Sequence, residues 1–377
     1  MKRLTLREGV ILLSVFLIVL LSSYLAASAA STDKWAQWRK SGHANRQLAL
    51  EEATVEQRQA TAAHCGRCHA GQGFLAWLPQ LQKGDPGLIQ GPGGTPATVG
   101  YLSMLGLNKF TVQPQTCTTC HNPDFTLRIT GSTPLLPAGF KAEGVGEGAL
   151  CMTCHNTRNG KIGWNDPDPK RWTAPHTASQ ADVIMSKNAY FLNYEEMKAS
   201  PHAAFTGDAC VTCHVKLNPE SHTFKAQRTV CTNCHGPNFT ADAVQKPIRA
   251  LLHEVEEAIA RRVLAAKEKI ATIRAWDPKT DQYTPNFAVR GADIVKVELE
   301  EIHGQQGLKF VLRDGRELYS QLGDVKDAAG KPVFPTSDVI VRAGWNYWLI
   351  EGDDSFGVHN PSFARAVLLR TLEVLQK

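Results

Sequence analysis

Methionine is scarce in this sequence, and so are the features of a nucleic-acid-binding protein. Only 5 methionines occur among the 377 residues, and those beyond the initiator are Met104, Met152, Met185 and Met197. None of these four stands in a setting typical of a metal ligand, so thioether ligation of a metal is not expected. The lysines and arginines are scattered and form no basic run with interleaved aromatic residues, which argues against nucleic acid binding.

Long apolar runs are also rare, and the one that is long enough to cross a bilayer lies at the N-terminus. Within residues 1–30, Lys2 and Arg7 precede an uncharged apolar run, and Ala27 and Ala29 have the spacing that signal peptidase reads. We therefore predict a cleaved export signal. The alternative is a retained anchor, since about twenty uncharged residues can span a bilayer. Both place the rest of the chain in the periplasm or at the cell surface, with membrane contact only through an uncleaved N-terminus.

All 10 cysteines fall in Cys-x-x-Cys-His motifs, and none is left over. The cysteine pairs are Cys65 and Cys68, Cys117 and Cys120, Cys151 and Cys154, Cys210 and Cys213, and Cys231 and Cys234; the histidines that follow them are His69, His121, His155, His214 and His235. Two thiols at this spacing lie on adjacent turns of a short helical segment and can form thioethers to one porphyrin, while the histidine binds its iron as the proximal ligand. Five disulfides would leave the histidines unexplained, and five equal motifs cannot pair off into zinc sites. The sequence therefore predicts five haem c groups.

Five irons need five further ligands if no iron is to be open to a substrate. The histidines that stand beside turn-forming or helix-starting residues, followed by small ones, are His43, His176, His202, His222 and His359. We predict these as distal ligands, which would make the haems bis-histidine electron carriers. His64, adjacent to Cys65, is the reserve distal ligand. His253 lies on the polar side of a predicted helix and His303 precedes a turn, so neither is predicted to bind iron.

The predicted organisation is a signal or anchor over residues 1–30, a pentahaem domain over residues 31–242, and a helical scaffold over residues 243–377. We expect a mainly α fold with a loop-rich haem domain, long C-terminal helices and a small antiparallel sheet at about residues 292–345. The expected elements of the scaffold are a helix from Pro247 to about Trp276, strands near Ile294–Leu299, Leu308–Leu312 and Glu317–Tyr319, and a helix from Pro361 to about Leu375 capped by Asn360.

The chain resembles a known superfamily of exported multihaem cytochromes. The resemblance lies in the five haem motifs, Ser-Gly-His43, Ser-Pro-His202, Ala-Pro-His176-Thr-Ala-Ser-Gln-Ala-Asp182, and Gly-Val-His359-Asn-Pro before the last helix. These look like cytochrome c nitrite reductase and hydroxylamine oxidoreductase, and the likeness extends from about Trp35 to His235 plus the last helix. Pentahaem nitrite reductases typically have lysine in place of one proximal histidine, whereas all five motifs here end in histidine. The resemblance therefore favours an electron-transfer relative.

Three functions remain open from the sequence. The first is an electron conduit that links a membrane quinol or periplasmic donor to a terminal reductase, a metal or an external acceptor. The second is an oxidoreductase in which one iron lacks a distal ligand and acts on a small nitrogen or sulfur compound. The third is a haem-bearing subunit of a larger complex or of a polymer at the cell surface. A complete set of distal histidines would favour the first over the second.

Overall fold

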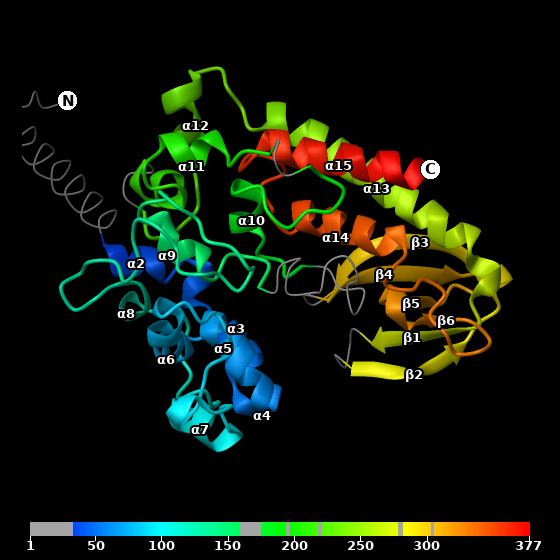
Figure 1. The fold of residues 1–377 in the computed structure, drawn as a ribbon, viewed down its shortest axis with the longest axis horizontal. Coiled ribbons are helices and arrows are strands. Elements are labelled where there is room, and N and C mark those ends of the chain that lie inside the picture. The colour runs from blue at the N-terminus through cyan, green and yellow to red at the C-terminus, as the bar shows by residue number, and fades with distance from the viewer. Residues whose placement is uncertain (1–32, 159–174, 194–196, 218–220, 278–281, 303–304) are drawn as a thin grey trace, which may run out of the picture.

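The computed structural model describes residues 33–158, 175–193, 197–217, 221–277, 282–302 and 305–377. A helical, loop-rich half is followed by a half in which long helices lie beside a small antiparallel sheet (Figure 1), which confirms the predicted fold class. The predicted export signal or anchor, residues 1–30, lies outside the described residues. Among the helices that are described, none is both long and apolar enough to cross a membrane.

The first half consists of short helices joined by irregular loops, and each Cys-x-x-Cys-His motif overlaps a helical segment. The motifs lie, in chain order, on α5, α8, α9, the π-helical η6 and α12. In the third motif the helix ends at Met152, so Cys154 lies in the turn that follows it. The helical segments of this half are α2 (Lys34–Trp38), η1 (Gly42–Ala44), α3 (Arg46–Ala53), α4 (Val55–Arg58), η2 (Gln59–Thr61), α5 (Ala62–His69), α6 (Gly71–Gln82), η3 (Pro92–Gly94), α7 (Val99–Met104), α8 (Cys117–Cys120), α9 (Gly148–Met152), α10 (Gln180–Ile184), α11 (Pro201–Phe205), η6 (Thr212–Lys216) and α12 (Arg228–His235).

Helices α5 and α6 approach each other more closely than side chains would allow. A Cβ atom at Gly73 of α6 would lie 2.1 Å from the carbonyl oxygen of Gly66, which stands inside the first motif. The core beneath them is apolar, with Phe74, Trp77 and Leu81 fully buried. Glycine at position 73 therefore sets the distance between the first motif and this core.

We expect Gly73→Ala to destabilise the folded protein by about 1–3 kcal/mol, because the added methyl group must push the two helices apart. This loss should outweigh the gain of about 1 kcal/mol that alanine brings to a helix interior. Gly100→Ala, in α7, is the matched control, since a Cβ there meets nothing within 4 Å. Urea denaturation of both variants checks the prediction, and equal stabilities would contradict the close approach.

The second half contains one antiparallel sheet in the order β2-β1-β5-β4-β3, with β6 paired to β1. Its strands are β1 (Thr272–Asp277), β2 (Gln282–Ala288), β3 (Ile294–Ile302), β4 (Gln305–Leu312), β5 (Glu317–Ser320) and β6 (Val325–Lys326), with η7 (Lys267–Lys269), η8 (Gly291–Asp293) and η9 (Leu322–Asp324) between them. In β3 the buried Val297 and Leu299 face Phe310 and Leu308 of β4. On the other face of this pair Lys309 binds both Glu298 and Glu300. This alternation fixes the register of the hairpin.

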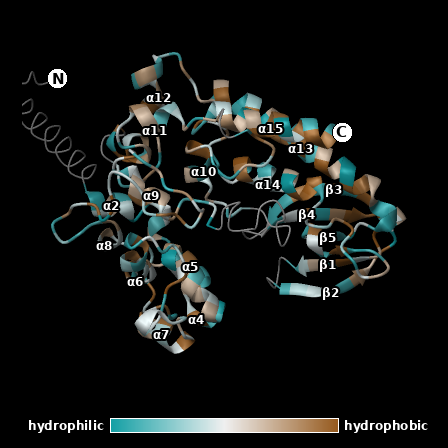
Figure 2. Ribbon diagram, viewed as in Figure 1, coloured by the Kyte–Doolittle hydropathy of each residue, from teal (hydrophilic) through white to brown (hydrophobic). Residues whose placement is uncertain are grey.

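Three long helices pack with the sheet: α13 (Asp242–Ala265), α14 (Val339–Glu351) and α15 (Pro361–Gln376). Hydrophobic residues recur along all three (Figure 2). The predicted apolar stripe of α13 is largely confirmed, with Ile248, Leu252, Val255, Ile259 and Val263 buried. In α15 the predicted residues Phe363, Val367, Leu368, Leu372 and Leu375 are all buried, and Asn360 accepts a hydrogen bond from the N–H of Phe363 as the predicted cap.

Several predicted boundaries in this half were wrong. The helix expected to run from Pro247 to Trp276 begins earlier, at Asp242, and ends at Ala265; Trp276 lies in β1. The sheet consequently starts at Thr272, before the expected residue 292, and its last strand ends at Lys326. Helix α14 was not predicted. The turn expected near His303 falls partly on residues that the structure does not describe, and its other end, Gly307, belongs to β4.

Buried hydrogen bonds join the second half to the segment that carries α10. Ser179 donates to the carbonyl oxygen of Leu349 at 2.7 Å, and the indole of Trp345 donates to that of Asn188 at 2.7 Å. The Asn346 side chain accepts from the N–H of Tyr190 and donates to its carbonyl oxygen. The C-terminal helices therefore hold residues 179–190 in place, directly beside the histidines described below.

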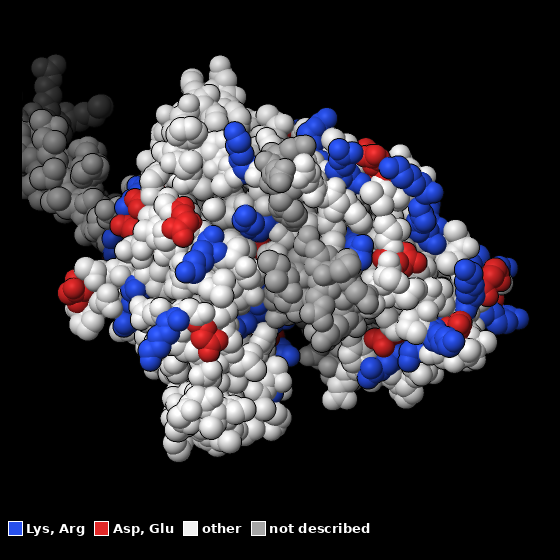
Figure 3. All heavy atoms as spheres, in the orientation of Figure 1, with Lys and Arg blue, Asp and Glu red and all other residues white. Residues whose placement is uncertain are grey.

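The surface differs between the two halves. In the view of Figure 3, acidic and basic side chains are interspersed over the half that contains the sheet, whereas the lobe around α7 shows almost no charge. The sequence agrees, because no charged residue occurs between Pro86 and Asn108. Met104 and Phe110 of this lobe are 80% and 78% exposed.

Candidate functional site

The structure brings ten histidines together as five pairs of rings. Every pair joins one motif histidine to one of the five histidines predicted from the sequence as distal ligands. The ring centroids are 5.9 Å apart for His69 and His176, 6.4 Å for His121 and His222, 6.1 Å for His155 and His43, 6.3 Å for His214 and His359, and 6.1 Å for His235 and His202. Their ligand roles stay predictions, but each motif has one partner imidazole at nearly the same separation.

This common separation fits one metal atom between two imidazoles. A metal–nitrogen bond to imidazole is about 2 Å long, and a ring nitrogen lies about 1 Å from the ring centre, so rings on opposite sides of one metal have centroids roughly 6 Å apart. The five separations range from 5.9 to 6.4 Å. Directly stacked rings would be closer and could not hold an iron between them. The histidine pairs therefore fit an axial ligand set for haem iron.

Hydrogen bonds fix the orientation of four of these ten rings. The Nδ1 atoms of His121 and His214 lie 2.8 Å from the carbonyl oxygens of Phe125 and Phe224. Nδ1 of His155 lies 3.2 Å from the side-chain oxygen of Gln180, and Nδ1 of His359 lies 2.6 Å from Asp353. Since these partners are acceptors, each Nδ1 carries the proton and Nε2 keeps its lone pair for a metal.

Burial keeps most of the paired imidazoles neutral, which is the state that binds metals. Burial, with a smaller effect of the neighbouring His155, lowers the pKa of His43 to about 4. Burial also lowers the pKa of His176 to about 3, helped by the positive charge of Arg158. The pKa values of His69 and His214 are lowered mainly by burial as well.

All ten cysteines are free thiols in the structure, so none of them is used in a disulfide. Those of the third motif lie at the centre of the array. Cys154 lies beside Cys68 of the first motif, and Cys151 lies beside Cys210 of the fourth, close enough to perturb the pKa values of these thiols. Burial raises the pKa of Cys120 in the second motif to about 12, and Cys151 lies near enough to add to this effect. The first, second and fourth motifs therefore all lie beside the third motif.

The fourth and fifth motifs are also neighbours. Cys213 lies close enough to Cys231 and Cys234 for their charges to raise its pKa, after the larger effect of burial. The partner histidines also lie close together. Burial lowers the pKa of His202, and the backbone groups of Val358 and His359 lie near enough to oppose this effect. The first, third, fourth and fifth motifs therefore form a continuous series.

Phe224 contacts three of the histidine pairs. Its ring centroid lies 4.6 Å from that of His43 and 5.7 Å from that of His222, and its carbonyl oxygen accepts the hydrogen bond from His214. Phe224 has a φ of 58°, a backbone conformation that non-glycine residues rarely adopt. This strained geometry directs the side chain toward the second and third motifs and the carbonyl group toward the fourth.

The remaining histidines are His64, His253 and His303. His64 lies near enough to His176 to lower its pKa. His253 is 68% exposed and binds Glu256 and Glu257 on the surface of α13. His303 lies outside the described residues. Within the described part of the chain, no group of three or more metal-ligating side chains is found.

Sequence reasoning missed the four residues that accept hydrogen bonds from these rings: Phe125, Gln180, Phe224 and Asp353. The Gln180 side chain both accepts from His155 and donates to the carbonyl oxygen of Asp353. Phe224 acts on His214 through its backbone, so its side chain gives no signal for this contact. Asp353 precedes His359 by six residues, and only the turn between them brings the two side chains together.

Neither a protein-family model nor a curated protein matches the sequence. Among solved structures, the crystal structure of outer cell wall cytochrome OcwA is similar to this chain, with 18% sequence identity and a TM-score of 0.45. The likeness covers 91% of this chain and 50% of that one, so the chain spans about half the length of that cytochrome.

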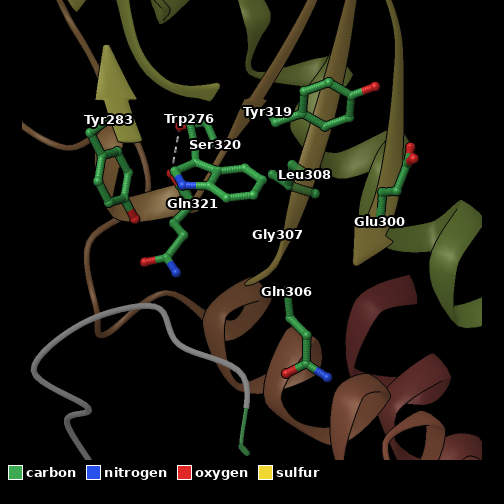
Figure 4. Close-up of a pocket in the computed structure, with 9 residues that line it drawn as sticks. All are labelled: Trp276, Tyr283, Glu300, Gln306, Gly307, Leu308, Tyr319, Ser320 and Gln321. Carbon is green, nitrogen blue, oxygen red and sulfur yellow. Dashed lines mark hydrogen bonds between the residues drawn. The ribbon is translucent and has the colours of Figure 1, made fainter. Parts of the chain in front are cut away.

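A shallow depression lies on the sheet, apart from the histidine pairs. Trp276, Tyr283, Tyr319 and Gln306 surround it, and none of its lining residues belongs to a motif (Figure 4). The hydroxyl group of Ser320 donates to the carbonyl oxygen of Arg274 in β1 at 2.7 Å, so it is already used by the sheet. The depression is too small for a cofactor the size of a haem.

Proposed function

We propose that this protein is an exported multihaem c-type cytochrome that transfers electrons through five bis-histidine haems. The observation that carries the proposal is the pairing of all five motif histidines with a second imidazole at 5.9 to 6.4 Å. An iron closed on both sides by imidazole carries single electrons and has no position for a substrate.

The residues divide this work between attachment and ligation. The two cysteines of each motif would hold the porphyrin covalently, and the motif histidine would bind its iron from one side. The partner histidine would close the other side. Haem c supplies one-electron chemistry when bound, and the surrounding protein sets its potential through ligand basicity, burial and hydrogen bonding.

The contacts between motifs support a conduit. Because the first, third, fourth and fifth motifs follow one another in space, electrons could cross from one end of the series to the other, with the second haem joined at the third. We propose a quinol-linked or periplasmic redox protein as donor and a terminal reductase or external acceptor as acceptor. The N-terminal segment would deliver the protein to the periplasm or the cell surface.

The proposal predicts a fully loaded, fully low-spin protein. After expression with the machinery for c-type haem attachment, the intact mass should exceed that of the polypeptide by five haems. The EPR spectrum of the ferric protein should contain only low-spin signals, and cyanide should leave the optical spectrum unchanged. Absence of tetrapyrrole mass would refute haem attachment, and a high-spin signal would refute complete bis-histidine ligation.

One observation favours a second candidate, an oxidoreductase that uses the first haem. Arg158 lies close enough to His69 and His176 to lower the pKa values of both, after burial and, for His69, after the opposing charge of Glu52. A cation beside an iron could hold a small anion if His176 left the metal. In that case one haem would be high-spin in the ferric protein and would bind nitrite or cyanide, which the same spectra would detect.

A further inference from the structure

One of the paired histidines is hydrogen-bonded to a buried carboxylate. Nδ1 of His359 lies 2.6 Å from Oδ1 of Asp353, whose side chain is 0% exposed, and the hydroxyl of Ser355 donates to the other carboxylate oxygen. Ser355 also accepts a hydrogen bond from the N–H of His359 at 3.1 Å. The aspartate, the serine and the histidine thus form a closed network in the turn between α14 and α15.

The other oriented rings have neutral partners. His121 and His214 donate to backbone carbonyl oxygens, and His155 donates to an amide oxygen. A carboxylate attracts the shared proton more strongly than these groups do, which makes the opposite nitrogen of the ring a stronger donor to a metal. Among the four rings with an assigned Nδ1 partner, His359 is therefore the most electron-rich ligand.

The charge of Asp353 also acts on the fourth motif directly. The carboxylate lies near enough to Cys210 to influence its pKa, and Cys210 belongs to the same motif as His214, the ring partner of His359. The negative charge of Asp353 therefore lies beside this ligand pair and is shielded from solvent.

We propose that Asp353 makes the haem between His214 and His359 the lowest-potential centre of the protein. The inference rests on the proposed haem function. A more basic axial ligand and a buried negative charge both stabilise ferric over ferrous iron, so they lower the reduction potential. Asp353 is a positioning and tuning residue, since it acts on the iron through His359.

The test is a spectroelectrochemical titration of the holoprotein and of Asp353→Asn. Asparagine can still accept the hydrogen bond through its oxygen but removes the charge. We expect the lowest midpoint potential to shift upward while the other four stay in place, and one low-spin EPR signal to change. Asp354→Asn is the matched control: it removes a charge one residue away, at a φ of 55° that asparagine tolerates. Its shift should be smaller.

A second variant gives an effect of opposite sign. Ser355→Ala removes the hydroxyl group that donates to Asp353, so His359 should become a stronger ligand and the lowest midpoint potential should fall.

If Asp353→Asn fails to fold, this downward shift alone supports the inference, and an unchanged or raised potential overturns it. Equal shifts in Asp353→Asn and Asp354→Asn would also overturn it. Five attached low-spin haems with no such shifts would leave the proposed function standing, whereas a wild type without haem would remove both.

Discussion

Replacing His43 by alanine should interrupt electron transfer at the centre of the array. His43 is the ring partner of His155, and the third motif meets the first, second and fourth through its cysteines. Without His43 the third iron would keep one protein ligand, so one haem should become high-spin and bind one equivalent of cyanide. All five haems should stay attached, because the thioethers are formed by other residues. Stopped-flow reduction should show electron equilibration slowed roughly tenfold or more, which corresponds to about 1.4 kcal/mol of added barrier.

His222→Ala is the matched control for this experiment. It removes the ring partner of His121 and should likewise produce one high-spin haem. The series from the first motif through the third and fourth to the fifth does not need the second motif, so most of the equilibration should keep its rate. If both variants slowed transfer equally, the third haem would not be the junction that the contacts between cysteines indicate.

The residues of the candidate site were largely predictable, but their pairing was not. Each Cys-x-x-Cys-His motif is a local pattern, and the settings of His43, His176, His202, His222 and His359 marked them as candidates. Which ring faces which motif depends on contacts between distant segments, as for His43 with His155. The acceptors of the Nδ1 protons were also beyond prediction, since a backbone carbonyl such as that of Phe224 has no sequence signature.

The fold of the second half shows a related limit. The helix α13 was predicted too long because apolar residues continue past Ala265, through Ile270 and Ile273, without a proline or glycine to end it. Residues 272–277 form a strand because β2, β5 and β6 pair with it, and of these β5 and β6 are distant in sequence. Helix α14 is buried nearly all round, so it lacks the one-sided apolar stripe that indicates a helix. Asp338, its N-cap, was the available signal.

A buried aspartate, Asp182, holds the end of the third motif in place. Its carboxylate accepts hydrogen bonds from the N–H and hydroxyl groups of Thr157, both at 2.8 Å, and from the side chain of Asn188. Thr157 follows His155 by two residues, and the carbonyl oxygen of Asn188 accepts from Trp345 of α14. Asp182 therefore links the third motif to the C-terminal helices.

Asp182→Ala should cost at least about 3 kcal/mol of folding free energy, since it leaves three buried donors without an acceptor at roughly 1–3 kcal/mol each.

Burial raises the pKa of Asp182 from 3.8 to about 6, against hydrogen bonds that lower it. Proton binding by this carboxyl therefore favours the folded state below pH 3.8, and this contribution is lost as the pH rises through 6. Relative to Asp182→Asn, which cannot titrate, the wild type should lose roughly 2.5 kcal/mol between pH 4 and pH 7, because one pKa unit corresponds to about 1.4 kcal/mol. Urea denaturation followed by circular dichroism at several pH values measures both effects, with the exposed Asp124→Asn as the variant that should change little. A parallel pH dependence in the wild type and Asp182→Asn would show that this carboxyl is already ionised in the folded protein.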